Sequence, residues 1–241
     1  SSKYSFGGGL DSYYEYLVKE HQLLGGVLPQ YERMFTEAMD SAEQHLWKNV
    51  TVVPHAPSLS VVVSSMGHGR SHVSLEHLAC FSGGMMALGS RIVPDRRHYL
   101  NIARMTTETC YWGYNSSLTG LGAEALEFYH PQDKDMYRVV TEADGTRHRG
   151  PPVGDPFVGV RYIWHEDYRN RPEVIESVLY MWRTTGDPVW QERGWQMFAS
   201  WMTHALTSVG VSSIRDVMSV PAYKTDGQES FALAETFKYY Y

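Results

Sequence analysis

Residues 178–202 read VLYMWRTTGDPVWQERGWQMFASWM, two runs of apolar residues at helical spacing that are separated by Gly186, Asp187 and Pro188. Glycine suits the left-handed position after the last turn of a helix, and proline suits the first turn of the next one. Asp187 can accept a hydrogen bond from the free N–H groups of that second helix. The stretch therefore predicts two antiparallel helices joined by a short turn.

The same plan occurs twice more along the chain. Each copy has a glycine expected to end one helix and a proline expected to open the next: Gly25 and Pro29 in residues 13–39, and Gly89 and Pro94 in residues 85–105. Repeated helical hairpins bury their apolar faces against their neighbours. The predicted fold class is all-α, as a helical array or a closed α/α toroid.

Short β-like runs and turn-rich stretches lie between the hairpins. Residues 50–54 (VTVVP) and 60–65 (SVVVSS) are typical of strands, whereas 64–72 and 141–156 are rich in turn residues. We expect β-hairpins and loops at one end of the helical array. Loops on one face of a rigid scaffold are where a functional site is expected.

The composition is that of an ordinary globular protein. The 241 residues carry a net charge of −6 without a basic run, which argues against nucleic acid and anionic membranes as partners. No apolar run is long enough to span a membrane, and the absence of an initiator Met and of a signal-peptide pattern suggests a mature or excised piece. The 17 tyrosines and 7 tryptophans are compatible with sugar binding.

Two cysteines and two glycosylation sequons bear on the compartment. Cys80 and Cys110 either form a disulfide or remain two buried thiols, and the residues alone leave both open. Asn49 and Asn115 begin N-x-S/T triplets, which fits a secretory-pathway protein.

The first predicted helix begins at Asp11 after three glycines, residues 7–9. Asp11 and Ser12 can both cap that helix, and Ser12 with Glu15 has the spacing of a capping box. The glycines could instead let the backbone approach a ligand, with Asp11 at the mouth of a sugar pocket. The helix is expected to bury its tyrosines.

Carboxylates gather in residues 170–177, NRPEVIES. Pro172 suits the first helical position, which puts Glu173 in the first turn and Glu176 on the same face one turn later. The two acids could form a solvated first turn with Arg171 beside them. Alternatively, they could point into the helical core as site residues.

A last helix is predicted from near Gly227 to the end of the sequence. Glu229 and Glu235 lie six residues apart in it and therefore on different faces, so that one is expected to point inward. A buried carboxylate needs a cation, a metal or a polar ligand. Acid pairs suit glycoside hydrolysis, in which inverting enzymes hold their two carboxyl groups roughly 6.5 to 9.5 Å apart.

Other chemistries find little support. The sequence contains no phosphate-binding loop, zinc-protease, C-x-x-C or nucleophile-elbow motif. His68, His72 and His77 match no spacing of a zinc site, which leaves zinc disfavoured.

Five motifs resemble glycoside hydrolase family 47, the class I α-1,2-mannosidases, in the order in which that family carries them. They are DSYYEYLVK (11–19), HLACFSGGMMALG (77–89), TCYWGY (109–114), RPEVIESVLYMWRTTGDP (171–188) and ESFALAETFKYYY (229–241). The resemblance implies an inverting, calcium-dependent (α/α)7 barrel that trims terminal α-1,2-linked mannose from high-mannose N-glycans. It also implies the endoplasmic reticulum or Golgi of the secretory pathway, or secretion.

The resemblance assigns roles to individual residues. Asp11 and Glu173 match the two candidates for the water-activating base. Arg171, His77, Phe231 and Glu235 match substrate-binding residues, Glu173, Glu176 and Glu235 match carboxylates that hold Ca²⁺ through waters, and Cys80 and Cys110 match the family's disulfide. Oxygen donors alone suit a hard cation such as Ca²⁺.

The resemblance also places two parts of the family's site outside this sequence. Its general acid lies upstream, and the threonine that contacts calcium directly lies beyond Tyr241. We therefore expect residues 1–241 to be a single partial catalytic domain, about half of the barrel, that is inactive without the other half. The alternatives are a mannosidase-like quality-control protein that binds glycans without turnover, and a helical scaffold without a site.

Overall fold

The computed structural model describes residues 4–51, 58–62, 64–65, 71–128, 139–141, 145, 147–149 and 160–241. Most of the two turn-rich stretches, and His68 with them, lies outside these residues. No helix within the described ranges has both the length and the hydropathy that a membrane crossing requires.

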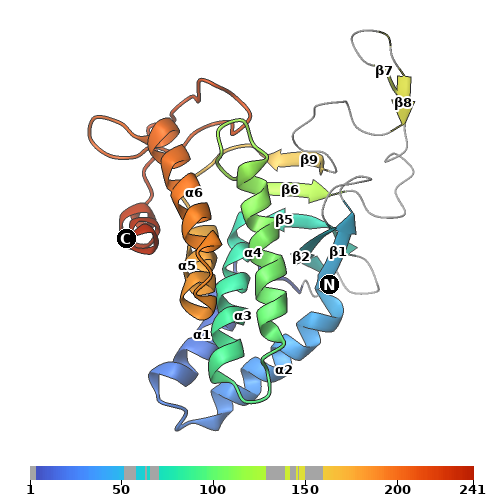
Figure 1. Cartoon of the computed structure of the whole chain (residues 1–241), viewed down its shortest axis with the longest axis vertical. Coiled ribbons are helices and arrows are strands. Elements are labelled where there is room, and N and C mark those ends of the chain that lie inside the picture. The colour runs from blue at the N-terminus through green and yellow to red at the C-terminus, as the bar shows by residue number, and fades with distance from the viewer. Residues whose placement is uncertain are drawn as a thin grey trace.

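Three helical hairpins stand next to one another, as predicted (Figure 1). They are α1 (Asp11–Leu23) with α2 (Pro29–His45), α3 (Phe81–Ile92) with α4 (Tyr99–Asn115), and α5 (Glu173–Thr185) with α6 (Val189–Ala205). Helix α3 contacts both α1 and α5, and α5 contacts the C-terminal α7 (Phe237–Tyr240), so that these helices form one layer. Helices α2, α4 and α6 each pack on the helix that precedes them. This layering confirms the α/α architecture.

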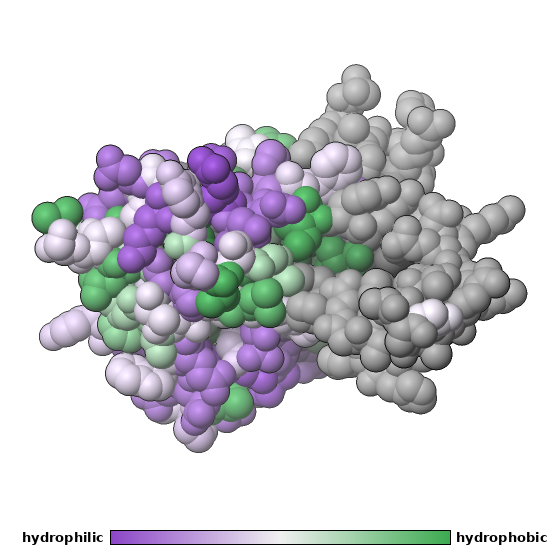
Figure 2. All heavy atoms as spheres, turned by 90° about the horizontal axis from the view of Figure 1, so that it is seen from above, coloured by the Kyte–Doolittle hydropathy of each residue, from purple (hydrophilic) through white to green (hydrophobic). Residues whose placement is uncertain are grey.

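The strands gather to one side of the helices and form small antiparallel sheets (Figure 1). The two-stranded sheets pair β1 (Trp47–Thr51) with β2 (Ser58–Val62), β3 (Ser64–Ser65) with β4 (Ser71–His72), and β7 (Val139–Thr141) with β8 (Arg147–Arg149). A three-stranded sheet has the order β5 (Ser74–Glu76), β6 (Ala125–Phe128), β9 (Val160–His165). Seen from above, the described part of the molecular surface carries hydrophilic residues with hydrophobic ones scattered among them (Figure 2).

Helix α3 is the centre of the core, and every residue from Phe81 to Ser90 is buried. The prediction that Gly89 ends this helix is wrong, because α3 continues to Ile92. A Cβ at Gly89 would lie 2.7 Å from the ring of Phe35, so this glycine permits the close approach of α2 instead of forming a turn. The prediction for Pro94 is also wrong, since α4 begins only at Tyr99.

The other hairpin signals are confirmed. Gly25 and Gly186 have φ angles of 61° and 68°, the left-handed conformation that ends a helix. Pro29 is the first residue of α2. The carboxylate of Asp187 accepts a hydrogen bond from the N–H of Val189 at 3.1 Å, at the start of α6.

Helix α1 begins at Asp11 as predicted, but without the predicted capping box. The residue before the helix is Leu10, and no side chain caps the helix there. Glu15 pairs with Lys19, one turn further along the helix. The tyrosines also differ from the prediction: Tyr13 and Tyr16 are 55% and 57% exposed, and the buried face of α1 consists of Leu17, Val18 and His21.

The last helix begins three residues later than predicted, at Ser230. Gly227 lies outside the helix, and its carbonyl accepts a hydrogen bond from the N–H of Ser213 at 2.7 Å. The helix then contains a π-helical turn, Ala232–Thr236, before α7. A π-helical turn moves the following side chains to a different face from the one that α-helical spacing predicts.

Candidate active site

A buried chain of polar side chains links α4, the turn before α3 and the start of α5. His77 opens the 3₁₀ turn His77–Cys80 and is 3% exposed. Its Nδ1 lies 2.9 Å from Oε2 of Glu173, and its Nε2 lies 2.7 Å from the hydroxyl of Tyr114. His77 therefore holds the carboxylate of Glu173, and Tyr114 in turn holds the ring of His77.

The environment of Tyr114 indicates where the protons lie. Burial, and then the nearby Tyr168, raise the pKa of Tyr114 well above its usual value, so its hydroxyl keeps its proton. That proton can be donated to Nε2 of His77, and Nδ1 then carries the hydrogen that is donated to Glu173. In this arrangement each group donates to the next, from Tyr114 to His77 and from His77 to the carboxylate of Glu173.

A disulfide links the 3₁₀ turn that carries His77 to helix α4, which carries Tyr114. Cys80 ends the 3₁₀ turn of His77 and pairs with Cys110 on α4, one turn before Tyr114. The alternative of two free thiols is therefore wrong. The disulfide joins elements that are 30 residues apart in sequence.

Glu176 lies one helical turn after Glu173 and is also buried. Nζ of Lys19 lies 3.1 Å from its Oε1, and the hydroxyl of Tyr239 donates to the same oxygen at 3.0 Å. Burial raises the pKa of Glu176 to about 7, and the charge of Glu15 adds to the shift against the opposing effect of Lys19. The alternative of a solvated first turn is therefore wrong for Glu176.

Glu235 approaches the same region from the π-helical turn. Burial, followed by the negative charge of Glu173, raises its pKa above the usual value. The hydroxyl of the neighbouring Thr236 donates to the backbone carbonyl of Asn170 at 2.6 Å, which anchors this turn to the segment before α5. Glu173, Glu176 and Glu235 are thus brought together, and Glu229 is exposed.

Arg171 is held between an acid and an aromatic ring. Its Nε lies 2.5 Å from Oε2 of Glu124, and its guanidinium lies 5.5 Å from the ring centre of Phe231. Glu124 also accepts a hydrogen bond from the N–H of His77 through its backbone carbonyl, at 2.9 Å. The sequence reasoning missed Glu124, because its pairing with Arg171 depends on the sheet and not on a local spacing.

The described hydrogen bond of Asp11 is local, because its Oδ1 accepts from the N–H of Ser12 at 2.9 Å. The catalytic role of Asp11 stays a prediction. Among the preceding glycines, Gly7 lies against Glu76, since a Cβ there would be 2.1 Å from the carboxylate. The close approach at Gly7 is thus to a side chain of the protein.

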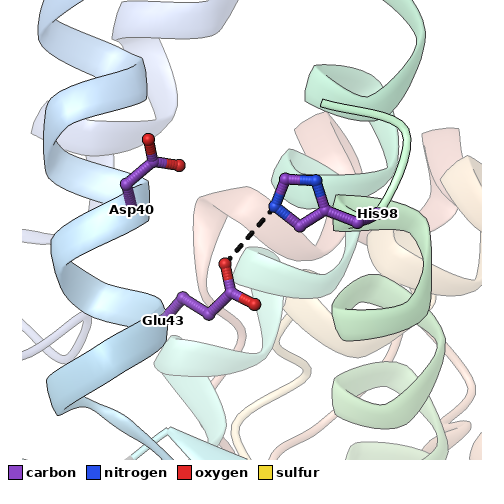
Figure 3. A group of neighbouring side chains, drawn as sticks. All are labelled: Asp40, Glu43 and His98. Atoms are coloured by element: carbon purple, nitrogen blue, oxygen red, sulfur yellow. Dashed lines mark ion pairs between the residues drawn. The ribbon is translucent and has the colours of Figure 1, made fainter. Parts of the chain in front are cut away.

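Three side chains elsewhere have the geometry of direct metal ligands. Asp40 and Glu43 on α2, with His98 before α4, offer atoms within 4.8 Å of one another, and no other such group occurs in the described ranges (Figure 3). Arg96 already binds Asp40 at 2.8 Å and 3.1 Å, and Tyr99 also donates to Asp40. A guanidinium thus occupies the place of a cation, and we interpret the group as a surface ion-pair cluster.

The predicted calcium carboxylates do not form such a direct cluster. Binding of a cation by Glu173, Glu176 and Glu235 through intervening waters is the mode that the family resemblance implies, and the absence of a direct cluster among them is compatible with it. The carboxylates outnumber their neighbouring cations, since Glu15 joins the three and the counter-charges come from Lys19 and Lys238. The oxygen donors and the surplus negative charge both fit a hard divalent cation.

Helical hairpins in two layers that gather three glutamates, one of them bound by a histidine, are compatible with the class of glycoside hydrolases built on an α/α barrel. The sequence model described as Glycosyl hydrolase family 47 matches residues 1–241, and the chain belongs to that family.

Curated relatives and a solved structure agree with this assignment. The chain is 34% identical over 239 residues to human mannosyl-oligosaccharide 1,2-alpha-mannosidase IC, covering 98% of this chain and 33% of the relative. It is 32% identical to the probable mannosyl-oligosaccharide alpha-1,2-mannosidase 1B of Aspergillus niger, covering 98% and 42%. The alpha-1,2-mannosidase from Trichoderma reesei superposes with a TM-score of 0.82 at 27% identity, over 99% of this chain and 47% of that one. The chain therefore spans about a third to a half of these relatives and has the fold of the corresponding part of the α/α barrel.

Proposed function

We propose that residues 1–241, completed by the other half of the α/α barrel, remove terminal α-1,2-linked mannose from high-mannose N-glycans. The observation that carries the proposal is the Glu173 carboxylate, held by a buried histidine at 2.9 Å inside a group of acids. It occurs in a chain of glycosyl hydrolase family 47 whose relatives are named for this activity. A positioned carboxylate beside a sugar pocket is what glycoside hydrolysis requires.

In this proposal Glu173 is the general base. His77 holds one carboxylate oxygen, which leaves the other oxygen to accept a proton from water. Water that attacks the sugar from the face opposite the leaving group inverts the anomeric centre, and the leaving oxygen takes a proton from the general acid, which the family resemblance places in the other half of the barrel. Arg171 and Phe231, which lie against each other, would contact the sugar ring. Asp11 remains the alternative base.

We further propose that Glu173, Glu176 and Glu235 hold Ca²⁺ through waters. Bound Ca²⁺ would supply oxygen coordination for sugar hydroxyls and orient the ring. Support comes from the setting of Glu176 and Glu235, because burial, and then neighbouring carboxylates, raise the pKa of both. A divalent cation would favour the ionised form of both groups.

The activity is tested with the intact protein and a mannose-α-1,2-mannose disaccharide. ¹H NMR of the first turnover should show β-mannose before mutarotation, and EDTA should abolish release until Ca²⁺ is added. Calorimetry with Ca²⁺ should show a site that Glu176→Gln weakens and Glu43→Gln leaves intact, because Glu43 belongs to the surface cluster. Release of α-mannose, or full activity in EDTA, would contradict the mechanism, and binding of the disaccharide without release would favour the quality-control alternative.

We also propose that the protein resides in the secretory pathway, in the endoplasmic reticulum or Golgi, or is secreted. The disulfide is of the kind that persists in oxidising compartments. Asn49 and Asn115 are both exposed and could accept glycans. A mass decrease on enzymatic deglycosylation of the native protein, lost in Asn49→Gln and Asn115→Gln, would test this.

A further inference from the structure

The solvent-facing side of the three-stranded sheet contains a hollow of about 550 Å³ that is lined by both polar and apolar groups. Its lining includes Ser74, Glu76, Glu124, Glu127, Trp164 and Arg169. Side chains alternate between the two faces of a strand, so Leu75, Leu126 and Phe128 point into the core while their neighbours face the hollow. The sheet thus presents one polar face to solvent.

Trp164 projects a large aromatic surface into this polar setting. It is 60% exposed, and its indole N–H donates to Oε2 of Glu127 at 2.6 Å. That hydrogen bond fixes the ring on a strand, which is a more rigid support than a loop. A fixed and exposed tryptophan is a flat apolar platform with a polar edge.

The hollow adjoins the candidate active site. Glu124 lines it and pairs with Arg171, which precedes Glu173 by two residues. Leu78 also lines it and follows His77 directly in the 3₁₀ turn. A ligand long enough to reach both places would have one end beside Glu173 and a second part over the sheet.

The chemistry of the hollow fits a neutral sugar. The C–H groups of a pyranose ring can pack on the face of Trp164, while ring hydroxyls donate to the carboxylates of Glu76, Glu124 or Glu127. These acids disfavour an anionic ligand, and the lining Arg169 is paired with Asp167 at 2.5 Å. Concave sites with an aromatic wall and a few convergent polar groups are typical of small-ligand binding.

We propose that this hollow binds a mannose residue of the substrate glycan other than the one that is cleaved, with Trp164 as the stacking platform. The proposal rests on the proposed function, because it takes the ligand to be the same high-mannose glycan. It makes Trp164 a determinant of preference for branched glycans over short ones.

The test uses three variants of the intact protein. Trp164→Ala removes the platform, Trp164→Phe keeps an aromatic face, and Trp195→Ala is the matched control, since Trp195 is 69% exposed on α6 and does not line the hollow. We expect Trp164→Ala to raise KM for a branched high-mannose glycan about 5- to 10-fold, with kcat within about 2-fold. Kinetics with the disaccharide should stay unchanged, and both other variants should stay close to wild type.

A binding measurement separates this proposal from the proposed function. NMR titration of the protein with the branched glycan should show changes in the chemical shifts of Trp164, whether or not mannose is released. Trp164→Ala should bind the glycan more weakly. Such binding without hydrolysis would support the hollow and overturn the proposed function. Hydrolysis with an unchanged KM in Trp164→Ala would overturn the proposal that the hollow binds mannose. Equal losses of glycan affinity in Trp164→Ala and Trp195→Ala would also overturn it.

Discussion

Two of the glutamate–histidine pairs among the described residues differ sharply in their surroundings. In the first, Glu173 and His77 lie 2.9 Å apart with side chains only 12% and 2% exposed. In the second, Glu43 and His98 lie 3.4 Å apart with side chains 41% and 48% exposed (Figure 3). Exposed ion pairs typically contribute between about 0 and 1 kcal/mol, because water competes for both partners. The same two residue types therefore form a site in one place and a surface contact in the other.

The difference arises from the elements that carry each pair. His77 follows a strand, opens a turn that ends in the disulfide, and faces the first turn of α5. Glu43 lies on α2, and His98 lies in the connection that leads to α4. His77 and Glu173 lie beside the packed helices α3, α4 and α5, where little of either side chain is exposed to water. Function in this fold is thus a property of the inner packing and not of the residue pair alone.

The largest expected effect is on catalysis. Glu173→Gln keeps the size of the side chain but removes the base, so kcat should fall about 10²- to 10⁴-fold. Glu43→Gln should stay within about 2-fold of wild type, because the surface pair contacts no part of the candidate site. Mannose release by both variants checks this, with circular dichroism as a control for folding. Equal activity in the two variants would remove Glu173 from the mechanism and leave Asp11 as the base.

The disulfide should give the next largest effect, on stability. Replacing both Cys80 and Cys110 by serine should lower the free energy of unfolding by about 3 to 4 kcal/mol, from the loop length in the chain-entropy model. Urea denaturation measures it, and the exposed pair Ser208→Ala with Ser219→Ala serves as a control for the number of changes. A loss below about 1 kcal/mol would mean that packing alone holds His77 and Tyr114 together.

The raised pKa of Glu176 predicts an effect of pH on stability. The folded protein holds this proton up to about pH 7, whereas the unfolded chain releases it near the usual glutamate value of 4.5. Its contribution is therefore fully present below pH 4.5 and is lost as the pH rises to 7, by at most about 3 kcal/mol without calcium.

Urea denaturation between pH 4.5 and 8 in EDTA measures this slope. Glu176→Gln should flatten it, and Glu43→Gln should keep the slope of the wild type. Calcium affinity should change in the opposite sense and rise with pH toward 7, since the cation competes with the proton. If Glu176→Gln keeps the wild-type slope, another group causes the pH dependence of stability. Glu235, whose pKa is also raised, is the first candidate.

Local signals in the sequence predicted local structure well. Gly186, Pro29 and the first-turn position of Glu173 follow from backbone preferences, and the structure confirms them. The pairing of Cys80 with Cys110 was implied by the family resemblance alone. Gly89 carries the same local signal as Gly186, but the side chain of Phe35 decides its role, and no window of sequence around Gly89 contains Phe35.

The contacts of the site that could not be predicted from the sequence join segments that are far apart along the chain. Lys19 and Glu176 are 157 residues apart, and Arg171 and Glu124 are 47 apart. No periodicity predicts such pairs, because they depend on how α1 packs near α5 and on the register of the sheet. The roles of Asp11, Glu173, Glu176 and Glu235 in catalysis and calcium binding remain predictions, which the variants above address.

The smallest effect concerns the tyrosine that distinguishes the buried pair from the exposed one. Tyr114→Phe leaves Nε2 of His77 buried without its partner, which should cost about 1 to 3 kcal/mol in the free energy of unfolding. His98→Ala removes an exposed imidazole and should stay within about 0.5 kcal/mol. Urea denaturation compares the two variants directly.

Nitrogen-15 NMR of the histidines then shows whether Tyr114 sets the tautomer of His77. In the wild-type protein the ring hydrogen of His77 should lie on Nδ1, which faces Glu173. Tyr114→Phe should shift the tautomers of His77 toward Nε2–H, since water or a neighbouring group can then accept from Nε2. His98 should show the same mixture of tautomers in both proteins. An unchanged Nδ1–H in Tyr114→Phe would mean that Glu173 alone orients the imidazole, and the buried pair would then differ from the surface pair by burial and not by its third member.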